Sequence, residues 1–208
     1  MSRDIHLYNR DVLIKQNLSF LQGKAFMEFG VYHGESMLMW HDLYQKNNLS
    51  TIFFGFDSFV GLPQETVDKN TIWDTGYFST GGIVNSDLSN RVGVKMITGF
   101  YDTSLNEETA RLLGDLKVGL VHIDCDTYSS TKTVWEWLLK YDLLACGALI
   151  VYDDWGAWLE AKCGEYEVGE AKAHQEIVDR YNLSVIDLGK YIVNPSFYEV
   201  KLYRYEGS

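Results

Sequence analysis

The chain has 208 residues, 46% of them hydrophobic, which fits a single compact domain with a sizeable core. Its formal net charge is -11. This charge argues against a nucleic-acid-binding protein, because affinity for phosphate backbones depends on Lys and Arg, and it favours a cationic ligand or a metal as the polar partner.

Strand-like runs alternate with helix-like segments along most of the chain. The strand-like runs are continuous stretches of apolar, β-branched and aromatic residues, and the helix-like segments carry apolar positions three and four apart. In chain order we predict a strand at 24–30, a helix at 35–48, strands at 51–58 and 94–99, a helix at 104–116, a strand at 117–124, a helix at 129–142, a strand at 147–154 and a helix at 169–182.

The C-terminal part of the chain has a different pattern. Residues 183–194 and 196–205 read as two strands with no helix between them, which predicts an antiparallel hairpin at one edge of the sheet. Continuous apolar strands that alternate with helices are typical of an α/β fold. We therefore predict a Rossmann-like, doubly wound, mostly parallel seven-stranded sheet with helices on both faces.

The segment from Val60 to Asn90 is polar and shows no clear period. A loop of this length in a compact domain usually has a function, so we expect an active-site lid or substrate loop. The longest apolar runs are too short to span a bilayer, and the N-terminus lacks an apolar signal-peptide region. We therefore expect a cytoplasmic protein without membrane insertion. Cys125, Cys146 and Cys163 lack metal-ligand spacing and read as buried or incidental thiols.

Carboxylates follow the predicted strands, at the edge of the sheet where ligands bind in such folds. These residues are Glu28, Asp57, Asp124, Asp153 and Asp154. A single acid in such a place is usually solvated or structural. Five acids on one rim repel one another unless a cation or hydrogen-bond donors compensate them, and they therefore indicate a functional site.

The stretch MEFGVYHGES, from Met27 to Ser36, joins the first strand to the first predicted helix. Gly30 and Gly34 would expose backbone N–H groups and a helix N-terminus to a ligand. Glu28 disfavours a phosphate there and favours an amine, so a small zwitterion fits. Asp57 is placed to accept hydrogen bonds from two ribose hydroxyls. An amino acid joined to a ribose describes S-adenosylmethionine.

Five motifs in order, EFGVYHGES, FDSFVGLP, TGFYDTSL, HIDCDTYSST and GALIVYDDW, carry a family resemblance. Together they resemble the macrocin O-methyltransferase (TylF-type) family of class I S-adenosylmethionine-dependent methyltransferases, which act largely on sugar hydroxyls. The similarity runs from about Lys24 to Trp155. It implies a divalent metal, usually Mg²⁺, held by Asp124, Asp153 and Asp154, with Asp126 as the alternative ligand.

Methyl transfer needs an aligned and activated oxygen. For the proton acceptor we name Asp124 and, as its rival, His174 on the last predicted helix. His122 reads as a packed core histidine. Phe100 and Tyr101 are candidates to bracket the adenine. The full set of predicted cofactor contacts is Glu28, Phe29, Gly30, Tyr32, Gly34, Ser36, Asp57, Ser58, Gly99, Phe100, Tyr101 and Asp124.

The resulting hypothesis is a Mg²⁺-dependent O-methyltransferase that acts on a sugar, a related polyol or another small-molecule or glycan substrate. The alternative is a nicotinamide-dependent oxidoreductase or a non-catalytic nucleotide-binding domain. That alternative lacks the full G-x-G-x-x-G spacing, because Tyr32 and His33 occupy the interval between the glycines, and it leaves the acids unexplained. The sequence leaves the acceptor and the oligomeric state open, a homo-oligomer included.

Overall fold

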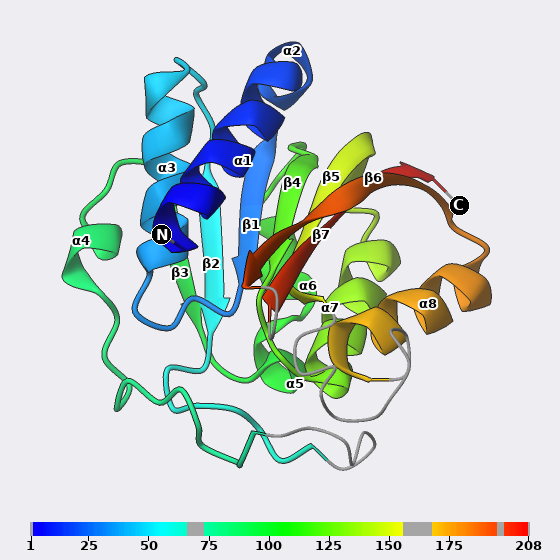
Figure 1. The fold of residues 1–208 in the computed structure, drawn as a ribbon. Helices are drawn as coiled ribbons and strands as arrows, with labels where there is room; N and C mark the ends of the chain where they lie inside the picture. Colours follow the sequence, from blue (N-terminus) through cyan, green and yellow to red (C-terminus); the bar gives the residue numbers. More distant parts are fainter. Residues whose placement is uncertain (1, 66–72, 156–167, 195–197, 208) are drawn as a thin grey trace.

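A computed structural model describes residues 2–65, 73–155, 168–194 and 198–207 (Figure 1). The helices are α1 (Ser2–Gln16), α2 (Leu18–Leu21), α3 (Glu35–Lys46), α4 (Ser86–Ser89), α5 (Tyr101–Ser104), α6 (Glu107–Arg111), α7 (Tyr128–Lys140) and α8 (Gly169–Tyr181). The strands are β1 (Ala25–Phe29), β2 (Phe53–Asp57), β3 (Val94–Thr98), β4 (Val118–Ile123), β5 (Leu144–Trp155), β6 (Ser184–Asn194) and β7 (Tyr198–Gly207).

The seven strands form one sheet in the order β3-β2-β1-β4-β5-β7-β6. Strands β1 to β5 are parallel, whereas β7 pairs antiparallel with both β5 and β6. The predicted Rossmann-like fold and its antiparallel C-terminal hairpin are therefore confirmed. Because the chain order reverses direction beside β1, the loops after β1 and β4 lie next to each other at the carboxyl edge, where ligands bind in such sheets.

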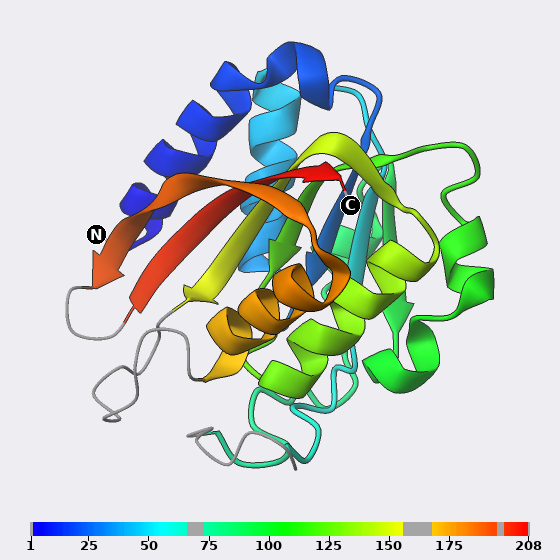
Figure 2. The same ribbon diagram turned by 90° about the vertical axis from the view of Figure 1, so that its right-hand side faces the viewer.

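Helices cover both faces of the sheet (Figure 2). On one face α1 and α3 pack over the strands, and Trp40 of α3 lies fully buried beside Phe26 of β1. On the other face, residues of α6, α7 and α8 pack against Met27 and Phe29 of the same strand. This alternation follows from the two-residue period of a strand, and it directs Glu28 to the α1 and α3 face.

The helices differ from the sequence prediction, which included neither α1 nor the short helices α2, α4 and α5. Helix α1 was not predicted, although Leu13 and Ile14 in its last turn are buried. The helix predicted at 104–116 is reduced to α6 (Glu107–Arg111), because Ser104 ends α5, Leu105 leaves the helical conformation and Asn106 starts a new helix. The Asn106 side chain accepts a hydrogen bond from the backbone N–H of Thr109, as an N-cap does. Among the described residues, no helix has both the length and the apolar character needed to cross a membrane.

The turn after β1 brings the backbone close to β4. Gly30 has φ +90°, and a Cβ built on it would lie 1.6 Å from the carbonyl oxygen of Asp124. Gly76 also has a positive φ, of +82°, but a Cβ there would meet no atom within 4 Å. Substitution at Gly76 would therefore cost only the strain of a left-handed backbone, whereas substitution at Gly30 would add a steric clash.

We expect Gly30→Ala to destabilise the protein far more than Gly76→Ala. The control should lose only about 1–2 kcal/mol for the left-handed conformation. Gly30→Ala should lose in addition the contact between the ends of β1 and β4, which the alanine methyl group would push apart. Urea denaturation of both variants measures the difference. Equal losses in unfolding free energy would show that this close approach is not required.

Candidate active site

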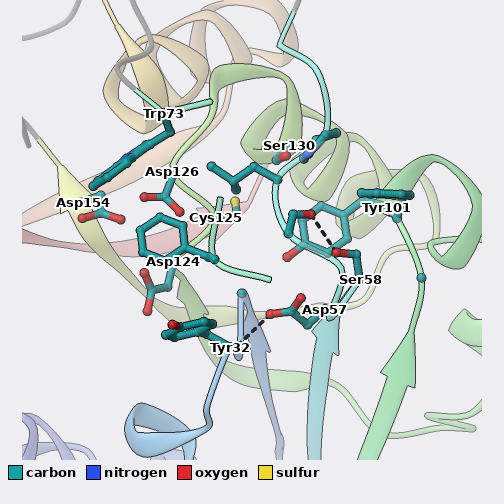
Figure 3. A pocket seen from close by; sticks show the side chains of 17 residues that line it. Tyr32, Asp57, Ser58, Trp73, Tyr101, Asp124, Cys125, Asp126, Ser130 and Asp154 are labelled. Carbon is teal, nitrogen blue, oxygen red and sulfur yellow. Dashed lines mark hydrogen bonds between the residues drawn. The ribbon is translucent and has the colours of Figure 1, made fainter. Parts of the chain in front are cut away.

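A pocket of about 430 Å³ opens at the carboxyl edge of the parallel strands. Its walls come from the turns at the carboxyl ends of β1, β2, β3 and β4, from the end of β5 itself and from the segment after residue 60 (Figure 3). It is lined by Gly30, Tyr32, Asp57, Ser58, Gly61, Leu62, Pro63, Trp73, Phe78, Gly99, Phe100, Tyr101, Asp124, Cys125, Asp126, Ser130 and Asp154.

Asp57, at the end of β2, holds the glycine loop in place. Its Oδ2 accepts hydrogen bonds from the backbone N–H groups of Val31 at 2.8 Å and Tyr32 at 2.7 Å. Its Oδ1 accepts a third from Phe59 at 2.7 Å. The loop amides that the sequence suggested for a ligand are thus partly used within the protein. Oδ1 retains more capacity to accept a hydrogen bond than Oδ2.

Three carboxylates gather on one side of the pocket, away from Asp57, Ser58 and Tyr101 (Figure 3). They belong to Asp124 at the end of β4, Asp126 in the following turn and Asp154 near the end of β5. Asp154 is within hydrogen-bonding contact of both other acids. Two carboxylates can share a hydrogen bond only when one of them carries a proton.

The environment of these acids disfavours their charged forms. Burial raises the pKa of Asp124, and the neighbouring charges of Asp153 and Asp154 raise it further. Burial and then the charge of Asp124 raise the pKa of Asp126 to about 7. Burial, followed by Asp126, raises the pKa of Asp154. The described residues that line the pocket include no Lys, Arg or His, so a bound cation would be needed to favour the charged forms of this cluster.

Asp153 lies on the opposite face of β5 and belongs to a different environment. Its Oδ1 accepts a hydrogen bond from Nη2 of Arg10 at 3.1 Å and lies 3.1 Å from Nε2 of His122. Although burial raises the pKa of Asp153, the hydrogen bond from His122 and the charge of Arg10 outweigh it and hold the pKa well below its usual range. Burial and Arg10 lower the pKa of His122, but the hydrogen bond to Asp153 and the nearby carboxylate of Glu28 raise it to about 9.

The sequence prediction placed Asp124, Asp153 and Asp154 together as metal ligands. The structure brings Asp124 and Asp154 into the pocket, whereas Asp153 approaches from the α1 and α3 face. Side-chain atoms of His122, Asp124 and Asp153 that could bind a metal lie within 4.8 Å of one another. Asp124 is therefore the acid that belongs both to the pocket cluster with Asp154 and to the group with His122 and Asp153.

Four predicted cofactor residues do not line the pocket. Glu28 is fully buried, with Oε2 3.4 Å from Nδ1 of His122 and no hydrogen bond to either carboxylate oxygen from the described chain. Phe29 is a core residue, and its ring stacks on that of Phe56. Gly34 is the N-cap of α3 and packs against Leu88. The hydroxyl of Ser36 accepts a hydrogen bond from Arg10 and lies 3.4 Å from Nδ1 of His122.

His174 is also outside the pocket lining. It is 3% exposed, its Nδ1 lies 2.9 Å from the hydroxyl of Tyr152, and its ring stacks on Tyr203 with centroids 4.1 Å apart. Burial lowers its pKa to about 3, so the ring is neutral. The structure does not bring His174 to the other candidate residues, and we assign it no catalytic role.

Sequence reasoning expected a lid or substrate loop in the segment after residue 60 but did not single out the side chains that line the pocket. Trp73 and Phe78 lie with their ring centroids 4.9 Å apart, and Trp73 is drawn over Asp126 and Asp154 (Figure 3). Glu65 of this segment accepts hydrogen bonds from the backbone and hydroxyl of Ser129, in the first turn of α7. No periodicity marks these side chains. Residues 66–72 of the predicted lid, and Cys163, lie outside the described residues.

Comparison with known proteins gives a family and a set of similar folds. Residues 27–155, more than half of the chain, match the protein family described as a methyltransferase domain. No curated protein sequence matches the chain. The solved structure of the O-methyltransferase NovP is similar, with 14% identity and a TM-score of 0.68 over 96% of this chain and 78% of NovP.

Two further solved structures are similar to the chain. CalS11, a calicheamicin methyltransferase, has 19% identity and a TM-score of 0.66 over 96% of this chain and 78% of its own, and its apo structure describes it as a TDP-rhamnose 3′-O-methyltransferase. TomG from Streptomyces achromogenes is an O-methyltransferase of tomaymycin synthesis that was solved with S-adenosylmethionine. It has 13% identity and a TM-score of 0.59 over 97% of this chain and 80% of TomG. Identities this low show a shared fold alone.

The buried neutral His174 predicts a pH dependence of stability. The unfolded chain binds a proton at this histidine below its ordinary pKa of 6.5, but the folded chain does so only below about 3. The free energy of unfolding should therefore fall as the pH decreases through this window, by about 1.4 kcal/mol per pH unit from this group. His174→Phe, which keeps a ring against Tyr203, should lack this component. Parallel slopes for the two proteins in denaturation at pH 4 to 6 would contradict it.

Proposed function

The chain belongs to the methyltransferase-domain family and is an S-adenosylmethionine-dependent methyltransferase, and from this premise we propose that it methylates a hydroxyl of a sugar or related polyol with the help of Mg²⁺. The observation that carries the proposal is the gathering of Asp124, Asp126 and Asp154 on one side of a pocket whose other side holds Asp57, Ser58 and Tyr101. The nicotinamide alternative is set aside, because it does not fit this family.

The acids suit a hard divalent cation. Their raised pKa values arise from burial and mutual repulsion, and a bound cation would remove both penalties. Carboxylate oxygens are the ligands that Mg²⁺ prefers. We propose Asp124, Asp153 and Asp154 as its ligands, because Asp124 has candidate ligand atoms near Asp153 and also contacts Asp154. When bound, Mg²⁺ supplies Lewis acidity and S-adenosylmethionine supplies an electrophilic methyl group.

We assign the proton acceptor to Asp126 in place of Asp124. Asp124 is committed to the cation in this scheme, whereas Asp126 lines the same pocket and interacts with both Asp124 and Asp154. Its backbone has φ 59°, a left-handed conformation that is uncommon for a residue with a side chain and is often found at functional sites. Asp126 would take the hydroxyl proton as the acceptor oxygen bonds to the methyl carbon and the carbon–sulfur bond breaks.

The opposite side of the pocket is proposed to hold the cofactor. Gly30 lets the backbone approach closely, and Oδ1 of Asp57 can accept a ribose hydroxyl while Oδ2 holds the loop. Phe100 and Tyr101 also line this region and can flank the adenine. Gly99 and Ser58 complete the wall.

The acceptor is proposed to lie against Trp73 and Phe78, beside the acids. A sugar can place a C–H face on an aromatic ring while its hydroxyls reach toward Asp126 and the cation, an arrangement typical of such pockets. The resemblance to macrocin O-methyltransferases and the fold shared with CalS11, which acts on TDP-rhamnose, both favour a sugar hydroxyl. The segment 60–90 would then serve as the substrate loop.

Metal dependence is the most direct test of this function. With radiolabelled S-adenosylmethionine and TDP-rhamnose among the offered sugars, methyl transfer should be lost in EDTA and restored by excess Mg²⁺. Asp154→Asn keeps an oxygen but loses a charge, so it should require more Mg²⁺ than the wild-type protein. Asp115→Asn, at an exposed acid that does not line the pocket, serves as the matched control. Full activity in EDTA, with metal-free protein confirmed by elemental analysis, would refute the metal mechanism.

Asp126→Asn tests the proton acceptor separately. The amide keeps the size of the side chain but cannot take a proton, so kcat should fall by about 10²- to 10⁴-fold. Binding of S-adenosylhomocysteine, measured by calorimetry, should stay within a few fold of wild type, because Asp126 is not assigned to the cofactor. A variant with nearly normal kcat would show that another group accepts the proton.

A further inference from the structure

We propose that Arg10 of α1 is a positioning residue for the metal site: its guanidinium fixes the carboxylate of Asp153 and, at the same time, the hydroxyl of Ser36 at the start of α3. The inference rests on the proposed Mg²⁺ site and assigns it a new component. It makes the N-terminal helix, which lies outside the matched family region of residues 27–155, part of the catalytic machinery.

The contacts of Arg10 are those of a built site. The residue is 3% exposed. Its Nη1 donates to Oγ of Ser36 at 2.8 Å, and its Nη2 donates to Oδ1 of Asp153 at 3.1 Å. The guanidinium also lies over the ring of Trp40, 4.8 Å from the centroid. One planar group therefore joins α1 and α3 to the end of β5.

This arrangement determines the orientation of the Asp153 carboxylate. Arg10 and Nε2 of His122 both meet the same oxygen, Oδ1, each at 3.1 Å. Two donors on one oxygen restrict rotation of the carboxylate. An oxygen of Asp153 is thereby kept within 4.8 Å of a carboxylate oxygen of Asp124. Partners that orient a metal ligand in this way are commonly required for full metal affinity.

The attachment of α1 to the sheet does not by itself require an arginine at this position. Burying a guanidinium costs free energy that an ion pair often only offsets, and an apolar side chain would attach α1 to Trp40 without that cost. Lysine could supply the positive charge, but its single ammonium group lacks the two separate nitrogens of a planar guanidinium that reach Ser36 and Asp153 together. The site therefore requires the planar, two-nitrogen geometry of an arginine side chain.

The sign of the effect on metal binding separates positioning from simple electrostatics. A positive charge beside a metal ligand repels a divalent cation. If only this electrostatic effect operated, the loss of the Arg10 charge would tighten metal binding. If Arg10 instead holds Asp153 in place, its removal must weaken metal binding despite the loss of that repulsion. If Arg10 serves only to attach α1, metal affinity per folded molecule does not change.

The test compares Mn²⁺ affinities, measured by calorimetry and by electron paramagnetic resonance, in Arg10→Met, Arg10→Lys and the wild-type protein. Methionine keeps the apolar stem against Trp40, and lysine keeps the charge. We expect both variants to bind Mn²⁺ about 10- to 100-fold more weakly. Lys15→Met, at an exposed position of the same helix, is the matched control and should bind normally. Circular dichroism confirms that each variant is folded.

A double-mutant cycle shows whether Arg10 acts through Asp153. Arg10→Met introduced into Asp153→Asn should cause little further loss of Mn²⁺ affinity, because the group that it orients is already impaired. Unchanged or tighter Mn²⁺ binding in a folded Arg10→Met or Arg10→Lys protein overturns the inference while leaving the proposed function intact. A wild-type protein that binds no Mn²⁺ overturns the metal site itself and this inference with it.

Discussion

Repulsion among buried carboxylates is the constraint around which the catalytic edge of this protein is organised. A parallel sheet brings the carboxyl ends of its strands to one edge, and here β1, β4 and β5 each deliver an acid to it. Adjacent acids at the end of β5 point to opposite faces, so the negative charge is divided between two compartments. Each compartment needs its own compensation, because like charges in a low-dielectric interior strongly disfavour their ionised forms.

The two compartments are compensated differently. On the α1 and α3 face, Arg10 and a protonated His122 balance Asp153 and Glu28 with charges that belong to the chain. On the pocket face the described neighbours provide no such cation, and the pKa values of Asp124, Asp126 and Asp154 are raised. An uncompensated cluster beside an internal salt-bridge network is a physical reason for the proposed cation to bind next to Asp124, within reach of Asp153 on the compensated side.

The sequence predicted the strands, helices α3, α7 and α8 and the C-terminal hairpin, because their patterns are strong and local. It also identified the acids of the rim. It did not predict α1, whose polar positions include the buried Arg10, since a buried charge partnered across the fold looks the same in sequence as a solvated one. Trp73 and Phe78 were missed for a related reason, because they reach the pocket from a segment with no period to reveal which side chains turn inward.

Adjacent residues of one motif proved the hardest to assign. The alternation of a strand separates Asp153 from Asp154 and Glu28 from Phe29, so each motif serves both faces of the sheet. Asp57 shows the same limit, because its partners in the glycine loop lie 25 and 26 positions away.

Arg10 and Asp153 are 143 positions apart, and only the completed sheet brings them together. Such a contact cannot form until α1 has docked on strands from the far end of the chain. The charge balance of the rim is thus a property of the whole fold, and the acids acquire their separate roles only when folding has assigned each one its partners.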